Sequence, residues 1–255
     1  MKEIESWISE ENLAKIYTSN YWNDIEQEKK KEWWISDGNY DKCLEFLNNS
    51  GLLSEYYIAE SEIKDYFKNS LEKIQVLDIA AGIGWTSALL SKLQNVSNIH
   101  ALEISRHRLS ELFEHSFKML SGDNYKVSRY LGSFYDIKLP DNSIDLVFMA
   151  QAFHHADQPF KLLSECDKVL KKGGVIALIG EDSTGIYQII RRFFSCLIKE
   201  GKIKFNFYQL FDDRNPTGDH HYRKTDYYFI LQGYGYEVSH KITTRGKTIY
   251  FAKKI

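Results

Sequence analysis

Between residues 74 and 182 the chain alternates short apolar runs with segments of helical periodicity, and this alternation constrains the fold most strongly. IQVLDIA and SIDLVFMA are nearly continuous apolar runs, which is typical of parallel strands buried on both faces. SNIHALEI, the stretch 125–130 and VIALIG are the other expected strands. Strands separated by helices at this spacing predict an α/β fold, a doubly wound, Rossmann-like and mostly parallel sheet with helices on both faces.

The segments on either side depart from this alternation. We expect residues 1–70 to form a helical N-terminal extension that acts as a lid, and residues 71–182 to form the core. Residues 183–223 read as a helical and loop insertion that covers the ligand site. Residues 224–255 are expected to supply a helix and an antiparallel hairpin, which complete a seven-stranded sheet.

The insertion carries a wide apolar stripe at helical spacing from Ile186 to Ile198. Such a stripe can pack on the sheet, cover the site or join two copies as a homodimer, and packing on the sheet is the commonest outcome. Arg191 and Arg192 could bind a substrate phosphate, although the solvated edge of an amphipathic helix is the commoner role for such a pair.

Composition narrows the range of partners. The net charge of −2 gives no electrostatic case for nucleic acid or an anionic membrane. No apolar run approaches the length that spans a bilayer, and the acidic N-terminus lacks the apolar core of a signal peptide. Three scattered cysteines predict free thiols. We therefore expect a cytoplasmic protein without a metal site.

The stretch VLDIAAGIGWTSALL breaks an apolar run where ligands bind in such sheets, at the carboxyl ends of the strands. Gly82 and Gly84 allow a tight turn and close approach of the backbone to a ligand. The helix that begins near Trp85 presents unpaired N–H groups. Glu103 ends the next strand, where a carboxylate can accept hydrogen bonds from two ribose hydroxyls. These features predict a nucleoside-containing ligand.

Two ligand classes fit a nucleoside site of this kind. Residues 82–87 partly match the dinucleotide fingerprint, which would indicate an NAD-dependent oxidoreductase. Asp78 argues against that alternative, because its carboxylate would repel a pyrophosphate but suits a ligand with an ammonium group.

The segment from Ile74 to Gly180 resembles the class I S-adenosylmethionine-dependent methyltransferases, specifically their small-molecule, type 11 branch. The resemblance rests on VLDIAAGIG, on LEIS and on LPDNSIDLVFMAQAFHHADQPFKLLSECDKVLKKGG, in which a helix is expected to run into KKGG. Ala80 departs from the pattern, since many members have glycine there. The resemblance implies transfer of a methyl group from S-adenosylmethionine to a small molecule.

The resemblance also implies which residues hold the cofactor. Asp78 and the loop from Ala80 through Gly82 to Gly84 would hold its methionine part. Glu103 would bind the ribose and Ile104 would lie along the adenine. Ser133 and Phe134 would lie at the adenine edge, and Gln151 would lie close to the cofactor.

A hydroxyl acceptor must also lose its proton, and histidine is the usual base near neutral pH. The candidate bases are His154, His155 and His221, each with a purely structural role as the alternative. Tyr17, Tyr21, Trp22 and His220 are candidates for contact with the acceptor. A protein that binds S-adenosylmethionine without catalysis is the remaining rival, and acceptor identity is left open.

Overall fold

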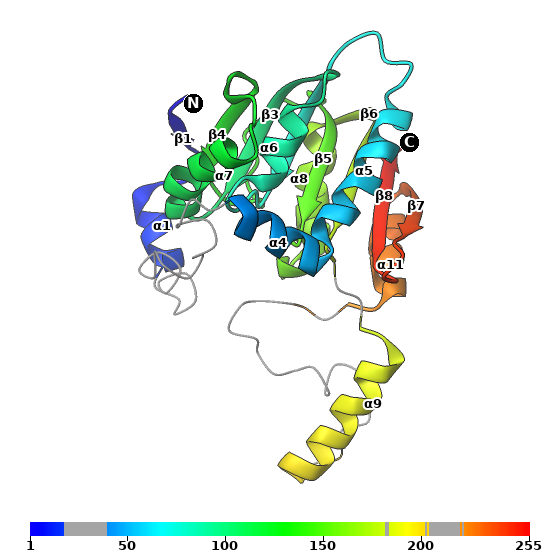
Figure 1. The fold of residues 1–255 in the computed structure, drawn as a ribbon. Helices are drawn as coiled ribbons and strands as arrows, with labels where there is room; N and C mark the ends of the chain where they lie inside the picture. Colours follow the sequence, from blue (N-terminus) through cyan, green and yellow to red (C-terminus); the bar gives the residue numbers. More distant parts are fainter. Residues whose placement is uncertain (18–39, 182–183, 202, 204–219, 221) are drawn as a thin grey trace.

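The computed structural model describes residues 1–17, 40–181, 184–201, 203, 220 and 222–255 (Figure 1). Its centre is an eight-stranded sheet in the order β1-β4-β3-β2-β5-β6-β8-β7. Every pair from β1 to β6 is parallel, whereas β8 pairs antiparallel with both β6 and β7. The strands are β1 (Ile4–Ser6), β2 (Ile74–Ile79), β3 (Val96–Glu103), β4 (Val127–Leu131), β5 (Ile144–Ala150), β6 (Leu170–Ile179), β7 (Tyr236–Ile242) and β8 (Thr248–Lys254). The predicted doubly wound fold with its C-terminal hairpin is confirmed.

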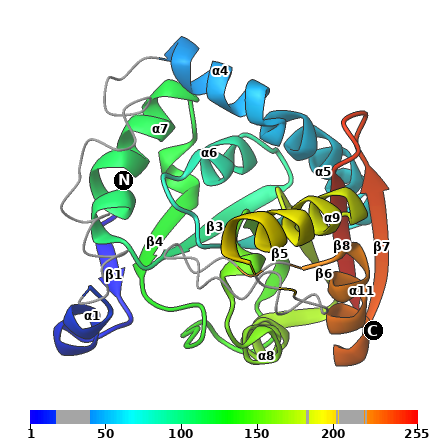
Figure 2. The same cartoon turned by 90° about the horizontal axis from the view of Figure 1, so that it is seen from below.

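Helices cover both faces of the sheet (Figure 2). The α-helices of the described residues are α1 (Glu10–Tyr17), α4 (Tyr40–Ser50), α5 (Leu52–Tyr66), α6 (Trp85–Ser91), α7 (Phe113–Met119), α8 (Pro159–Val169), α9 (Ile186–Ser195) and α11 (Lys224–Tyr234). Side chains of α4 to α7 share one buried cluster with Val76 and Phe148, and side chains of α8 and α11 share the other with Leu77 and Val147. Successive residues of β2 and β5 thus point to opposite faces, as the buried apolar runs predict.

The first strand is an addition to the expected sheet. Only helices were expected before residue 70, but Ile4 to Ser6 pair in parallel with Arg129 to Leu131 of β4. The segment is too short for a period of two to stand out from the sequence. Its pairing extends the sheet to eight strands and places α1 beside the end of β3 (Figure 1).

The expected continuation of α8 into KKGG is wrong. The helix ends at Val169, and Leu170 already pairs with Ile144 as the first residue of β6. Leu170 is fully buried and Lys171 donates to both carboxylate oxygens of Asp145 at 2.9 Å. Burial and strand pairing therefore outweigh the helical signal of the two lysines.

The apolar stripe of the insertion does not pack on the sheet, which is the commonest of the three roles that such a stripe can have. Figure 1 shows α9 standing clear of the sheet, beyond the carboxyl ends of its parallel strands. The side chains of Ile186 and Ile198 are more than 70% exposed. Among the described residues, no helix is both long enough and apolar enough to cross a membrane.

Candidate functional site

Asp78 lies near the carboxyl end of β2 and is buried. Thr86 Oγ1 and Ser87 Oγ donate to its Oδ2 atom at 2.7 and 2.5 Å, whereas Oδ1 is buried without a hydrogen-bond partner among the described residues. Burial raises the pKa of Asp78 to about 6, although the hydrogen bonds from the two hydroxyls lower the pKa in part. A carboxylate in this state lacks a donor or a cation at Oδ1.

Glu103 ends the neighbouring strand β3 and is also buried. Its Oε2 accepts the N–H of Gly82 at 2.8 Å, and its Oε1 accepts the N–H groups of Ile104 and Ser105 at 3.0 and 2.9 Å. Burial raises its pKa, while Arg108 and these N–H donors oppose the rise. The carboxylate thus ties the glycine loop to β3 and has lone pairs left for a ligand.

The loop between β2 and α6 holds three residues at positive φ: Ala80 at 52°, Gly82 at 53° and Gly84 at 79°. At Gly84 an added Cβ would lie 2.4 Å from the ring of Phe113, so this glycine is required for packing as well as for its backbone conformation. Ala80 adopts a left-handed conformation that favours glycine, which explains why glycine suits this position in related chains.

S-adenosylmethionine carries an ammonium group and a ribose, and the residues present fit both. The unpartnered Oδ1 of Asp78 matches a cationic donor, and Glu103 matches a pair of hydroxyl donors. A pyrophosphate would instead meet a buried carboxylate at Asp78. The two carboxylates at this edge therefore favour S-adenosylmethionine over a dinucleotide.

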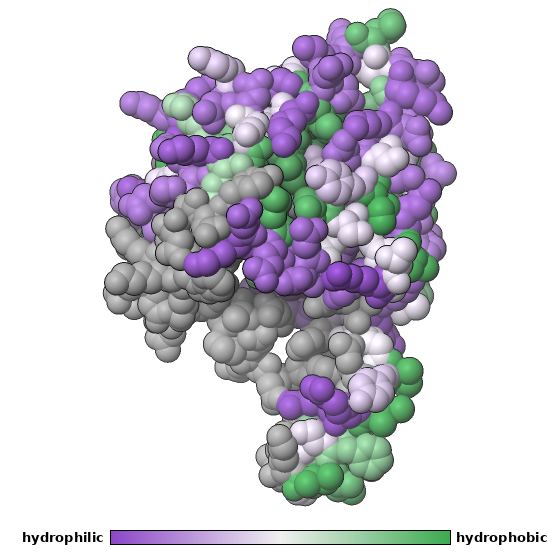
Figure 3. Space-filling view, in the orientation of Figure 1, coloured by the Kyte–Doolittle hydropathy of each residue, from purple (hydrophilic) through white to green (hydrophobic). Residues whose placement is uncertain are grey.

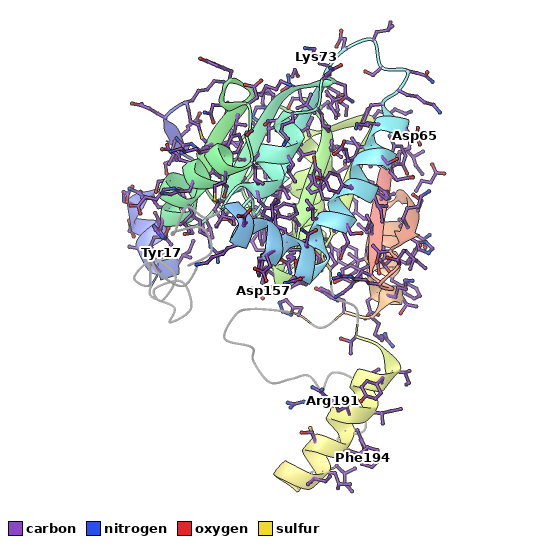
Figure 4. The ribbon with its side chains drawn as sticks, in the orientation of Figure 1. Tyr17, Asp65, Lys73, Asp157, Arg191 and Phe194 are labelled. Atoms are coloured by element: carbon purple, nitrogen blue, oxygen red, sulfur yellow. The ribbon has the colours of Figure 1, made fainter. Side chains whose placement is uncertain are left out.

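Tyr17 connects the N-terminal segment to this site. Its hydroxyl donates to the carbonyl of Ile104 at 2.8 Å and accepts from the N–H of Arg106 at 3.1 Å. Figure 4 shows Tyr17 at the same edge of the molecule as Asp157, opposite Lys73. The candidate contact residue and the candidate adenine neighbour are thus brought together.

Ser133 and Phe134 follow β4 and lie beyond the same edge. Ser133 Oγ accepts the N–H of Tyr135 at 3.2 Å, and the half-buried Phe134 ring meets the Tyr135 ring edge-on at 4.6 Å. Gln151 directly follows β5 and adopts a φ of 54°. An added Cβ at Gly180 would lie 2.5 Å from Cγ of Gln151. The role of both segments beside the cofactor stays a prediction.

A third buried carboxylate, Glu181, lies two residues after the end of β6. It accepts the N–H groups of Ala152 and Phe153 at 3.0 and 2.9 Å, and His154 Nδ1 lies 2.7 Å from its Oε2. The hydroxyl of Tyr227 donates to the same oxygen at 3.3 Å. A buried carboxylate in contact with Nδ1 orients the imidazole and favours the tautomer whose lone pair is on Nε2.

His220 lies next to the pair formed by His154 and His155. The N–H of His220 donates to the carbonyl of His154 at 2.8 Å, and its Nε2 lies 2.8 Å from Oδ1 of Asp157. The ring of His155 lies 4.3 Å from that of His154. No group of side chains among the described residues has the arrangement of a metal site. Tyr21, Trp22 and His221 lie outside the described residues.

Sequence reasoning missed Glu181 and Glu55. Glu55 is buried on α5 and accepts the N–H of Gly180 at 2.6 Å, so it holds the end of β6. Glu181 had a usable signal, because an acid directly follows the apolar run VIALIG, just as Asp78 and Glu103 follow theirs. Glu55 had none, since it lies in a helix among other charged residues.

Comparison with known proteins favours the methyltransferase alternative over the NAD-dependent one. Residues 77–178 match the methyltransferase domain family. The chain carries a class I S-adenosylmethionine-dependent methyltransferase domain. This methyltransferase domain includes Asp78, Glu103 and the histidine pair after β5, and its family argues against the NAD-dependent alternative.

The alignments with sequence relatives cover only part of each relative's length. Sterol 24-C-methyltransferase of Aspergillus fumigatus is 27% identical over 48% of this chain and 33% of its own. The mitochondrial ubiquinone biosynthesis O-methyltransferase of Dictyostelium discoideum is 25% identical over 60% of this chain and 50% of its own. The chain thus spans between a third and a half of these relatives.

Solved structures share the fold over more of the chain. A SAM-dependent methyltransferase from Aquifex aeolicus aligns with a TM-score of 0.57 and 21% identity, covering 85% of this chain and 99% of its own. The [4+2]-cyclase SpnF aligns with a TM-score of 0.53 and 14% identity, covering 76% and 80%. These likenesses support the fold, and the second shows that the methyltransferase fold alone does not determine the reaction.

Proposed function

We propose that this chain transfers a methyl group from S-adenosylmethionine to a hydroxyl of a small-molecule acceptor, with His154 as the base. The observation that carries the proposal is the Glu181–His154 pair. It lies after β5 and β6, beside the edge where β2 and β3 present Asp78 and Glu103. The proposed cofactor site and an oriented imidazole would therefore share one edge of the sheet.

S-adenosylmethionine supplies a sulfonium methyl that is already activated for in-line displacement. Asp78 and the loop from Ala80 to Gly84 would hold its methionine part, Glu103 its ribose and Ile104 its adenine, with Ser133, Phe134 and Gln151 at the margins. The protein's remaining task is to place the acceptor oxygen in line, which can contribute an effective molarity on the order of 10⁵ M or more.

His154 would remove the hydroxyl proton of the acceptor at Nε2. Glu181 supports this step in two ways. It fixes the ring through Nδ1, and its negative charge stabilises the imidazolium that forms. The three backbone N–H groups from Ala152 to His154 that donate to Glu181 fix the carboxylate in turn. The base is therefore preorganised.

The curated relatives support a small-molecule acceptor and leave the acceptor atom to be tested. Their names include carbon, oxygen and nitrogen methyltransferases, the last a dimethylglycine N-methyltransferase of Parasynechococcus marenigrum. Oxygen is favoured here because transfer to a hydroxyl needs a base, and His154 with Glu181 provides one.

The test is radiolabel transfer from methyl-labelled S-adenosylmethionine to a panel of phenols, alcohols, amines and activated carbon acids. We expect a hydroxyl acceptor. We expect His154→Gln to lower kcat about 10²–10⁴-fold while cofactor affinity stays within twofold. Glu181→Gln should lower kcat less than His154→Gln does. It should also shift the acidic limb of the profile of kcat against pH. His115→Gln, on the exposed surface of α7, is the matched control.

Two outcomes would overturn the proposal. One is transfer only to nitrogen or carbon acceptors, at a rate that His154→Gln does not change. The other is tight cofactor binding without transfer to any acceptor class, which would favour the non-catalytic binding protein.

A further inference from the structure

The segment formed by α9 and the π-helical turn Cys196–Glu200 is amphipathic and exposed. Its exposed apolar side chains follow one stripe along the helix, and this set is called the α9 stripe below. The α9 stripe consists of Ile186, Tyr187, Ile190, Phe194, Leu197 and Ile198. Figure 3 shows apolar surface on this projecting part of the molecule, and Figure 4 shows Arg191 and Phe194 on it, clear of the sheet.

We propose that the α9 stripe docks on the surface of an anionic lipid bilayer. A helix with one strongly apolar face, aromatic side chains on that face and basic residues on the other binds in the plane of the interface. Tyr187 and Ile198 are 74% and 79% exposed, so they would bury apolar area on docking. The helix is too short to span the bilayer, which leaves an interfacial position.

Charge favours lipid over a second copy of the chain. The sequence from 186 to 204 is basic although the whole chain carries a net charge of −2. Its charged residues are Arg191, Arg192, Lys199, Lys202 and Lys204 against Glu200. Arg191, exposed beside the stripe, would approach its own symmetry mate in a two-fold contact, and like charges oppose that approach. An anionic surface instead attracts each basic residue.

The position of α9 gives docking a consequence for the site. The helix follows shortly after Glu181 and lies beyond the carboxyl ends of β2, β5 and β6 (Figure 1). A bilayer in contact with the stripe would therefore lie at the same end of the molecule as the edge that carries Asp78 and His154. The overall charge argues only against attraction of the whole molecule to a membrane, and the lack of a spanning helix within the described ranges argues only against insertion. Neither opposes a local interfacial helix.

The test is flotation of the full chain with two kinds of vesicle, phosphatidylcholine alone and phosphatidylcholine mixed equally with phosphatidylglycerol. We expect binding to the anionic vesicles and weakening as salt rises from about 0.1 M to about 1 M. The double variant Tyr187→Ser/Ile198→Ser should lower the partition coefficient at least about tenfold. Arg191→Gln should lower it about fivefold.

Phe229→Ser is the matched control, because Phe229 is 77% exposed on α11. It should leave vesicle binding unchanged, and circular dichroism should show that all variants remain folded. Vesicle binding is read without any methyl transfer, so the result does not depend on the proposed reaction. Absence of binding, or equal binding by the double variant, would overturn the proposal. A concentration-dependent dimer that the double variant abolishes, without vesicle binding, would assign the stripe to a second copy instead.

Discussion

Replacement of Asp78 by asparagine should stabilise the cofactor-free protein at neutral pH but weaken its binding of S-adenosylmethionine. The pKa of this buried carboxyl is about 6 instead of 3.8, because burial disfavours its charge. That difference corresponds to about 3 kcal/mol of destabilisation when the group is ionised in the folded chain at neutral pH. Asparagine keeps the shape and an acceptor for Thr86 and Ser87 but carries no charge.

The effect should depend on pH with a definite sign. The folded chain binds the Asp78 proton more tightly than the unfolded chain does. Its stabilising contribution is therefore complete below about pH 4 and is lost as pH rises through about 6. Between about pH 4 and pH 7, the free energy of unfolding of the unmodified chain should fall by about 2 kcal/mol relative to Asp78→Asn.

Urea unfolding of both chains at the two pH values measures this difference, and calorimetry measures the cofactor. We expect Asp78→Asn to lose most of its affinity for S-adenosylmethionine, because the unpartnered Oδ1 no longer carries charge. The reasoning is refuted if the difference in unfolding free energy stays constant with pH, or if it changes in the opposite direction.

Three further substitutions test the glycine loop and the N-terminal contact. Ala80→Gly should stabilise the chain by about 0.5–1 kcal/mol in urea unfolding, because relief of a left-handed alanine exceeds the added entropy of glycine; a loss of stability would contradict this. Gly84→Ala should destabilise by more than about 1 kcal/mol, because its Cβ meets Phe113, and an unchanged melting temperature would be inconsistent with the packing. Tyr17→Phe should weaken cofactor binding several-fold by calorimetry, because it releases the carbonyl of Ile104, and unchanged affinity would place Tyr17 outside the site.

The sequence predicts the parallel core well because burial on both faces leaves a direct signature in the runs around Val76, Leu146 and Ile176. It predicts Asp78 and Glu103 because an acid at the end of such a run is conspicuous. The role of the α9 stripe was not predictable, since the same helical periodicity is found in helices that pack on a sheet, cover a site or dock on another surface. The ring orientation of His154 was also beyond prediction, because it depends on Glu181, which is distant in sequence and adjacent only through the pairing of β5 with β6.

Calorimetric titration with S-adenosylmethionine, S-adenosylhomocysteine and NAD tests the central claim most directly. The account predicts that both adenosyl ligands bind to the unmodified chain, that Asp78→Ala and Glu103→Ala both lose this binding, and that NAD does not bind. Binding of NAD alone, or adenosyl binding that survives both substitutions, would contradict it.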